Sequence, residues 1–292
     1  MSATTTVHQS RAAAVPPQAY FVGSAVFHYL GPSFAVLLFA RVDVLGVAWL
    51  RIAAAAVLFA AWRRPWRAVL ASDRGGQRLV VLLGVVLAVM NACFYLAIDR
   101  LPLATVAAIE FIGPVVLALA GARVARNVAA VAAAGIGVYL LTGVQFAGEA
   151  AGIALASANA ALFTAYIVLA HRLAQRPRLG GVDGLAAAML VALVVVSPIG
   201  ASGAARAFGD PVALAAGIGV GISSSVVPYV FDQLAMARLP RATYALFVAL
   251  LPVTAAIVGA VVLGQLPTAV DVAGIALVMA GVAMHRPRER VT

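Results

Sequence analysis

Apolar runs of about 20 residues recur along the whole chain, and this feature constrains the fold more than any other. At 1.5 Å per residue, a helix of that length crosses a hydrocarbon core of ~30 Å. Backbone N–H and C=O groups in lipid must be paired within the segment, so each run is expected to be a helix. The weak alternation in segments of ~10 residues that is typical of an outer-membrane barrel is not present in the sequence. The chain is therefore predicted to be an all-α polytopic membrane protein.

Ten segments are predicted to span the membrane, and Pro-containing breakers separate several of them. The spans are residues 18–40, 44–62, 79–98, 103–121, 127–144, 150–170, 184–203, 212–236, 243–263 and 269–285. Only 10% of the residues are charged, against about 25% in an average soluble domain. No stretch between the spans is long enough for a separate soluble domain.

The arginines predict the orientation of the spans, since all 20 basic residues are arginine. With the N-terminus in the cytoplasm, 16 arginines fall in inside segments and 3 in outside segments, while Arg51 lies within a span. This bias follows the positive-inside rule. Both termini are therefore expected in the cytoplasm, residues 1–17 as a disordered tail and residues 286–292 as a basic tail. The arginines cap apolar runs, so the net charge of +10 does not indicate a nucleic-acid partner.

Two further features limit the chemistry that the chain can carry. Residues 1–17 have no basic region leading directly into a short apolar core, so they are not expected to be a cleaved signal peptide. The single cysteine, Cys93, lies inside an apolar run, which rules out an intrachain disulfide and a cysteine-based metal cluster. Neither a cofactor nor a metal is expected.

An internal repeat divides the chain into two related halves. Residues 95–114, YLAIDRLPLATVAAIEFIGP, match residues 233–252, QLAMARLPRATYALFVALLP, at nine of 20 positions with a constant offset of 138. The first copy joins spans 3 and 4, and the second joins spans 8 and 9. Because five spans per half is an odd number, the halves 18–144 and 150–285 are predicted to face opposite ways. Inverted repeats place a binding site near the midplane and allow alternating access.

Several motifs carry a resemblance to a known family. They are Gly46–Arg51 (GVAWLR), Met90–Leu96 (MNACFYL), Leu101–Leu103 (LPL), Ile109–Pro114 (IEFIGP), Val227–Tyr229 (VPY) and Gly264. With these residues the chain resembles the drug/metabolite transporter superfamily, EamA type, and within it the threonine/homoserine exporter branch. The resemblance covers roughly residues 18–285. It implies two EamA-type five-helix repeats and export of small amino acids across a bacterial inner membrane, driven by the proton gradient.

The second half departs from the family pattern at two places. Leu251-Pro252 stands where an acidic residue often precedes the proline, and Gly264-Gln265 stands where Gly-Glu often follows span 9. A mechanism that places a carboxylate at either position does not fit this chain. Another metabolite or a drug-like amphiphile is the alternative substrate class.

Two charged residues lie well inside the predicted spans. A charge within a span costs several kcal/mol unless it is paired or faces a water-filled cavity, so Arg51 and Glu110 are the leading site candidates. Each lies seven residues past the outer end of its span, at Val44 and Leu103, which places both roughly 10 Å below the outer interface. Asn91 lies at the same level. We expect Arg51 and Glu110 to pair, either as substrate and proton groups or as a structural ion pair.

Other polar and aromatic side chains are candidates for lining the cavity, with helix packing as the alternative role for each. His28 has a reference pKa close to 6.5 and would suit a proton relay. Asn159 and Tyr166 lie on one stripe of span 6 together with Phe163. The remaining candidates are Tyr29, Tyr95, the serine run Ser223-Ser224-Ser225 with Ser224 as its leading member, Tyr229, Tyr244 and Phe247.

An intramembrane enzyme is the main rival class. It would need paired carboxylates, a metal-ligand cluster or a Ser/His dyad at membrane depth, whereas the four histidines are scattered and Glu110 has no second intramembrane acid. A transporter is therefore expected rather than an enzyme. Its partners would be a small-molecule substrate, protons and the lipid bilayer, and the sequence leaves the oligomeric state open.

Overall fold

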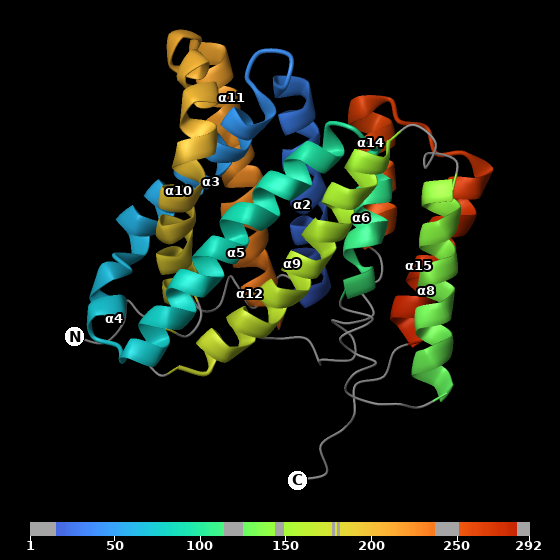
Figure 1. The fold of residues 1–292 in the computed structure, drawn as a ribbon, viewed down its shortest axis with the longest axis horizontal. Helices are drawn as coiled ribbons and strands as arrows, with labels where there is room; N and C mark the ends of the chain where they lie inside the picture. Colours follow the sequence, from blue (N-terminus) through green and yellow to red (C-terminus); the bar gives the residue numbers. More distant parts are fainter. Residues whose placement is uncertain are drawn as a thin grey trace.

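The computed structural model describes residues 16–113, 125–143, 149–176, 179, 182–236 and 251–284. These residues form helices and the turns between them (Figure 1). The helices are α2 (Pro17–Leu38), α3 (Val44–Arg63), α4 (Trp66–Leu70), α5 (Arg74–Ile98), α6 (Leu103–Glu110), α8 (Ala125–Gly143), α9 (Ala150–Ala174), α10 (Val182–Ala204), the 3-10 helix η1 (Ala205–Gly209), α11 (Pro211–Gly221), the π-helix η2 (Ile222–Val226), α12 (Val227–Met236), α14 (Leu251–Leu263) and α15 (Ala269–Met284).

The helices have the length and composition of membrane spans. Six helical segments are long and apolar enough to cross a membrane: Ala19–Leu38, Val44–Arg63, Arg74–Ile98, Ala150–Leu173, Val182–Gly209 and Pro211–Phe231. Shorter apolar helices cover Val128–Leu141, Leu251–Leu263 and Ala269–Gly281. The expectation of an all-α membrane protein is confirmed at this level. The predicted span 103–121 is described only as far as Gly113, and the predicted span 243–263 only from Leu251 onward.

Helix ends fall where the sequence places its breakers and caps. Helix α3 ends before Arg64, which takes the left-handed conformation at φ 48° ahead of Pro65. Helix α5 begins earlier than the predicted residue 79, because the Asp73 side chain accepts a hydrogen bond from the Gly76 N–H and caps the first turn. The short helix α4 and the 3-10 helix η1 were not expected from the sequence.

Helices from the two halves of the chain pack mainly on each other. Helix α3 packs on α10, α5 on α9, and α8 on α15, while α2 lies against α12 and α14. In Figure 1 the pair α5 and α9 runs side by side, and α8 and α15 form a pair at one edge. The largest hydrophobic cluster accordingly joins residues of both halves, including Tyr29, Tyr95, Val106, Ala156 and Val220.

Ion pairs also connect the two halves. Within the described ranges, four such pairs join a residue before position 144 to one after position 149: Arg63–Asp183 (2.7 Å), Arg176–Asp73 (3.3 Å), Arg41–Asp210 (2.9 Å) and Arg206–Asp43 (3.7 Å). All of them lie at helix ends and none is fully buried. Each is therefore a weak link by itself.

The predicted span 212–236 contains a π-helical turn, which the sequence did not reveal. Helix α11 passes through η2 into α12 without a break. A π-turn accommodates an extra residue and changes which side chains face a neighbouring helix, and such turns are frequent at functional sites. Glycines let this turn approach its neighbours: a methyl group at position 31 would overlap Ser224, and one at position 221 would meet the Arg51 carbonyl oxygen at 2.8 Å.

Candidate functional site

Among the residues whose burial the structure describes, the buried acid is Glu110, the last residue of α6. Its side chain is 6% exposed, and one carboxylate oxygen accepts a hydrogen bond of 3.1 Å from the Asn159 amide nitrogen. Asn159 lies on α9 and is completely buried. The stripe predicted on this helix therefore faces α6, since Phe163 also packs edge-on against Phe111 at 6.3 Å between ring centroids.

The cation Arg51 on α3 is partly buried, and the π-helical turn holds it. Its Nε donates to the Ser225 hydroxyl at 3.1 Å, and its Nη2 donates to the Ser224 carbonyl oxygen at 3.2 Å. The guanidinium also lies over the Tyr95 ring, 5.4 Å from the centroid. A cation over an aromatic face away from water is stabilised by the ring quadrupole.

The expected direct ion pair between Arg51 and Glu110 is wrong for this conformation. Among the described residues no nitrogen of Arg51 lies within 4.0 Å of a Glu110 oxygen. The reason is that each charge takes a neutral partner from the other half of the chain, Ser225 for Arg51 and Asn159 for Glu110. The two charges still interact electrostatically across the intervening space.

Four buried polar atoms in the described part of the chain lack a well-formed hydrogen bond, and all belong to predicted site residues. They are the hydroxyls of Tyr29, Tyr95 and Ser224 and the Oδ1 atom of Asn159. The Tyr95 hydroxyl lies close to Arg51 and Ser224 but is not aligned for a hydrogen bond to either. Because buried polar groups are normally paired, four such atoms beside the buried Glu110 and the partly buried Arg51 indicate a place for a polar ligand.

Asn91 and His28 lie in the structure in ways that favour a packing role. The Asn91 amide donates to the Leu87 carbonyl oxygen of its own helix at 2.8 Å. The half-buried His28 ring packs edge-on against Tyr29 at 5.3 Å. His28 also lies within electrostatic range of Arg51, which keeps it near the polar cluster.

The remaining candidates are divided between the core and the part of the chain outside the described residues. Tyr166 stacks on Phe163 at 5.9 Å, and both pack with Tyr229 against a second hydrophobic cluster. Tyr244 and Phe247 lie outside the described residues. Within the described ranges no three His, Cys, Asp or Glu residues are grouped as a metal ion would require.

Ser225 provides the side-chain contact within the serine run 223–225. All three serines are sequence candidates, with Ser224 as the leading one. On a regular helix only one serine of the three would face α3, but the π-turn brings both the Ser225 hydroxyl and the Ser224 carbonyl to Arg51. Ser223 bonds back to Val220 of its own helix, as serines in lipid usually do.

Apolar helices of spanning length around a buried charged cluster define a polytopic membrane protein of the transporter class. Residues 150–285 match the EamA-like transporter family. The chain is 32% identical over 255 residues, 86% of its length and 84% of theirs, to the threonine/homoserine exporters RhtA of Salmonella typhimurium strain LT2 and Escherichia coli strain K12. A solved crystal structure shares the fold with a TM-score of 0.60 at 18% identity, covering 91% of this chain and 97% of the other. The chain belongs to the EamA-like transporter family.

Proposed function

We propose that this protein exports small amino acids of the threonine and homoserine kind across the bacterial inner membrane, in exchange for protons and by alternating access. The relatives named as threonine/homoserine exporters support the substrate class. The observation that carries the proposal is the division of the buried polar cluster into a side rich in donors and a side rich in acceptors.

The donor side is built around Arg51. The guanidinium has five N–H groups, and in the described part of the chain only those on Nε and Nη2 have hydrogen-bond acceptors. The buried hydroxyls of Tyr95 and Ser224 lie beside it with no aligned partner. A planar guanidinium flanked by hydroxyl donors suits a carboxylate, which accepts two parallel hydrogen bonds from arginine.

The acceptor side is built around Glu110. One carboxylate oxygen is bonded to Asn159, and the Asn159 Oδ1 atom has no hydrogen-bond partner within the described residues. The buried Tyr29 hydroxyl lies within electrostatic range of Glu110. An ammonium group offers three donors and would find three acceptors here. A zwitterionic amino acid placed between the two sides would satisfy both, whereas an apolar drug would leave both charges uncompensated.

Glu110 can also account for coupling to protons. A single carboxylate in lipid binds either a proton or an ammonium group, and both neutralise the charge. Entry of a proton from outside would release the substrate ammonium there, and binding of the next substrate from the cytoplasm would displace the proton inward. Competition at one residue is therefore sufficient for exchange, without a second acidic group.

The packing of the helices supports two inverted five-helix halves and ten spans. If the spans are numbered as predicted, α3 with α10 joins spans 2 and 7, α6 with α14 joins 4 and 9, and α8 with α15 joins 5 and 10. The pairs α2 with α12 and α5 with α9 join spans 1 and 8 and spans 3 and 6. Exchanging the halves converts each of these pairs into itself or into another of them, as a two-fold relation between inverted repeats would require.

The topology is tested by labelling engineered cysteines. In a Cys93→Ser background, single cysteines replace Leu70 or Ala205, and a membrane-impermeant maleimide is added to intact cells. The Ala205→Cys variant should react in intact cells. The Leu70→Cys variant should react only after the membrane is opened. Labelling of positions 70 and 205 from the same side of the membrane would contradict the inverted arrangement.

The substrate class is tested in proteoliposomes loaded with a pH indicator. Threonine and homoserine should each release protons across the membrane in a protein-dependent way, while a lipophilic cation should not. If only the lipophilic cation responds, the amino-acid assignment fails and a drug-like amphiphile takes its place. A resistance screen with amino acids and analogues in a sensitive host extends the comparison to further substrates.

A further inference from the structure

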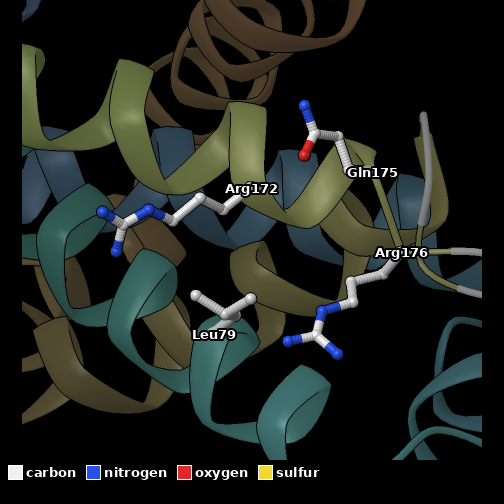
Figure 2. A pocket seen from close by; sticks show the side chains of 4 residues that line it. All are labelled: Leu79, Arg172, Gln175 and Arg176. Atoms are coloured by element: carbon white, nitrogen blue, oxygen red, sulfur yellow. The ribbon is translucent and has the colours of Figure 1, made fainter.

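An open basic pocket lies away from the central polar cluster, where the first turns of α5 meet the end of α9. It has a volume of about 570 Å³ and is lined by Leu79, Arg172, Gln175 and Arg176. Figure 2 shows both guanidinium groups on the same side of α9, with Leu79 between them on the facing helix. The pocket thus combines two cations with an apolar wall.

The positive charge of this pocket is only partly balanced. Arg176 makes an ion pair of 3.3 Å with Asp73, in which both side chains are substantially exposed. Gln175 is bonded to the His171 ring at 2.9 Å. Arg172 is exposed, and in the described part of the chain its side chain has no hydrogen-bond or ion-pair partner. Arg74 and Arg78 add two more exposed cations on the first turns of α5. An anion from outside the protein is the missing partner.

The position of the pocket indicates where this anion comes from. Helices α5 and α9 are both of spanning length, so their meeting ends lie at the membrane–water interface. On α5 the apolar side chains Val81, Val85 and Val89 are 50%, 38% and 42% exposed, as expected of a surface that faces the bilayer. Leu82, one turn beyond Leu79 on the same face of α5, is 52% exposed. An apolar track therefore leads from the cationic pocket into the hydrocarbon region.

We propose that this pocket binds the phosphodiester headgroup of an anionic glycerophospholipid, with Arg172 and Arg176 on the phosphate and an acyl chain along Leu79 and Leu82. Arginine pairs with phosphate through two parallel N–H groups. Basic pockets between helices at the interface are a known mode of headgroup binding. Free phosphate would use the guanidinium groups but not the apolar track, so the acyl chain distinguishes the two sources. The proposal needs only the membrane location of the chain and is independent of the transported substrate.

The experiment measures lipid retained by the purified full-length protein. The protein is taken from bilayers of equimolar phosphatidylglycerol and phosphatidylcholine into mild detergent, and bound lipid is counted by native mass spectrometry. Phosphatidylglycerol should be retained in excess. The double variant Arg172→Gln, Arg176→Gln should lower that retention roughly tenfold or more, the scale expected for two arginines at an interface. The matched control Arg64→Gln, Arg67→Gln removes two exposed charges from the neighbouring α3–α4 turn and should change it little.

Three results would overturn the proposal. The first is equal loss in the control pair, which would indicate general charge attraction. The second is unchanged retention in the pocket variant. The third is stabilisation of the detergent-solubilised protein against heat by inorganic phosphate as strong as that by short-chain phosphatidylglycerol, which would assign the site to a free anion. If the double variant folds poorly, the single variant Arg172→Gln, which breaks no ion pair among the described residues, gives the same comparison.

Discussion

The two halves of the chain contribute different chemistry to one buried cluster. The first half supplies both charges, Arg51 and Glu110, while the second half supplies their neutral hydrogen-bond partners, Ser225 and Asn159. At the constant offset of the repeat, the position that corresponds to Glu110 is Val248. The charged groups of the cluster thus occur in the first half only, although the two halves share the matching segment 95–114 and 233–252.

This difference indicates how the halves depend on each other. A buried charge is stable only with partners that replace its water, and here each charge finds a partner across the boundary between the halves. Moving one half relative to the other would stretch the two hydrogen bonds, and a ligand that bridges Arg51 and Glu110 would compensate them. The site is thus expected to sense both the substrate and the relative position of the halves.

The largest effect is expected at the acid. Glu110→Gln keeps the shape and one oxygen that can accept from Asn159, but it removes the charge and replaces the second oxygen by a donating NH2 group. Neither a proton nor an ammonium group is then bound. We expect loss of transport by more than about 100-fold, as for removal of the charged partner of a buried ion pair, with normal amounts of protein in the membrane. Uptake into proteoliposomes and a membrane blot measure the two quantities.

The matched control for this variant is Glu149→Gln, which makes the same change at the partly exposed start of α9. It should transport normally. Normal export by Glu110→Gln would remove Glu110 from the mechanism and leave the comparison of the halves without functional meaning.

The cation should follow with a smaller loss. Arg51→Lys preserves the charge but loses the planar fork that bonds Ser225 and the Ser224 carbonyl together, and lysine cannot hold a carboxylate through two parallel bonds. We expect transport to fall roughly 10- to 100-fold, mainly as a rise in KM for the amino acid. Concentration series in proteoliposomes provide KM, with Arg67→Lys on the exposed helix α4 as the control. An unchanged KM would assign Arg51 to structure.

Replacement of Asn159, the neutral partner of Glu110, should reduce transport less than the changes at Glu110 and Arg51. Asn159→Leu removes the donor to Glu110 and the unpaired Oδ1 atom at nearly constant volume. Since a hydrogen bond to a charged group contributes about 1.5 kcal/mol at the lower end of its range, transport should fall by about tenfold. Asn159→Asp should not restore it, because it places a second acid beside Glu110. Asn91→Leu on α5 is the comparison, since Asn91 bonds only to Leu87 of its own helix among the described residues. A larger loss at Asn91 would reverse the two roles.

Sequence reasoning predicted the class of fold well because lipid imposes few choices. A run of apolar residues must become a helix, and Pro65 and Pro102 mark helix ends that local chemistry determines. The start of α5 was predicted at residue 79, and the cap that Asp73 provides was not recognised. The sequence also predicted that Arg51 and Glu110 lie near each other, and the two charges are within electrostatic range. Their partners could not be predicted, because residues at one depth on different helices are related by rotation and tilt, which side-chain packing determines.

The π-turn is the clearest example of a structural feature that could not be predicted from the sequence. Residues 222–226, ISSSV, contain no proline or glycine that would indicate an irregular turn. It depends on the close approach of η2 to α2 and α3, where Gly31 and Gly221 leave room. Only that long-range contact determines that Ser225, rather than Ser224, presents its hydroxyl to Arg51.

The smallest effect is expected at the ion pairs that join the halves outside the hydrocarbon core. Hydrogen bonds from the backbone of Ala213 and from Arg41 lower the pKa of Asp210 below its ordinary value of 3.8. A carboxyl group with a lowered pKa stabilises the fold fully above the ordinary value, and this contribution is lost as the pH falls through the lowered one. Asp210→Asn should therefore reduce the melting temperature slightly, by about 2 °C or less, at pH 6, and this difference should shrink below pH 3.8. Thermal unfolding of the purified protein at pH 6 and below pH 3.8 measures this difference in melting temperature. Asp99→Asn at the exposed end of α5 is the control. Transport should remain close to normal in this variant. A transport defect as deep as that of Glu110→Gln would mean that the surface links, and not the buried cluster, hold the halves in their working arrangement.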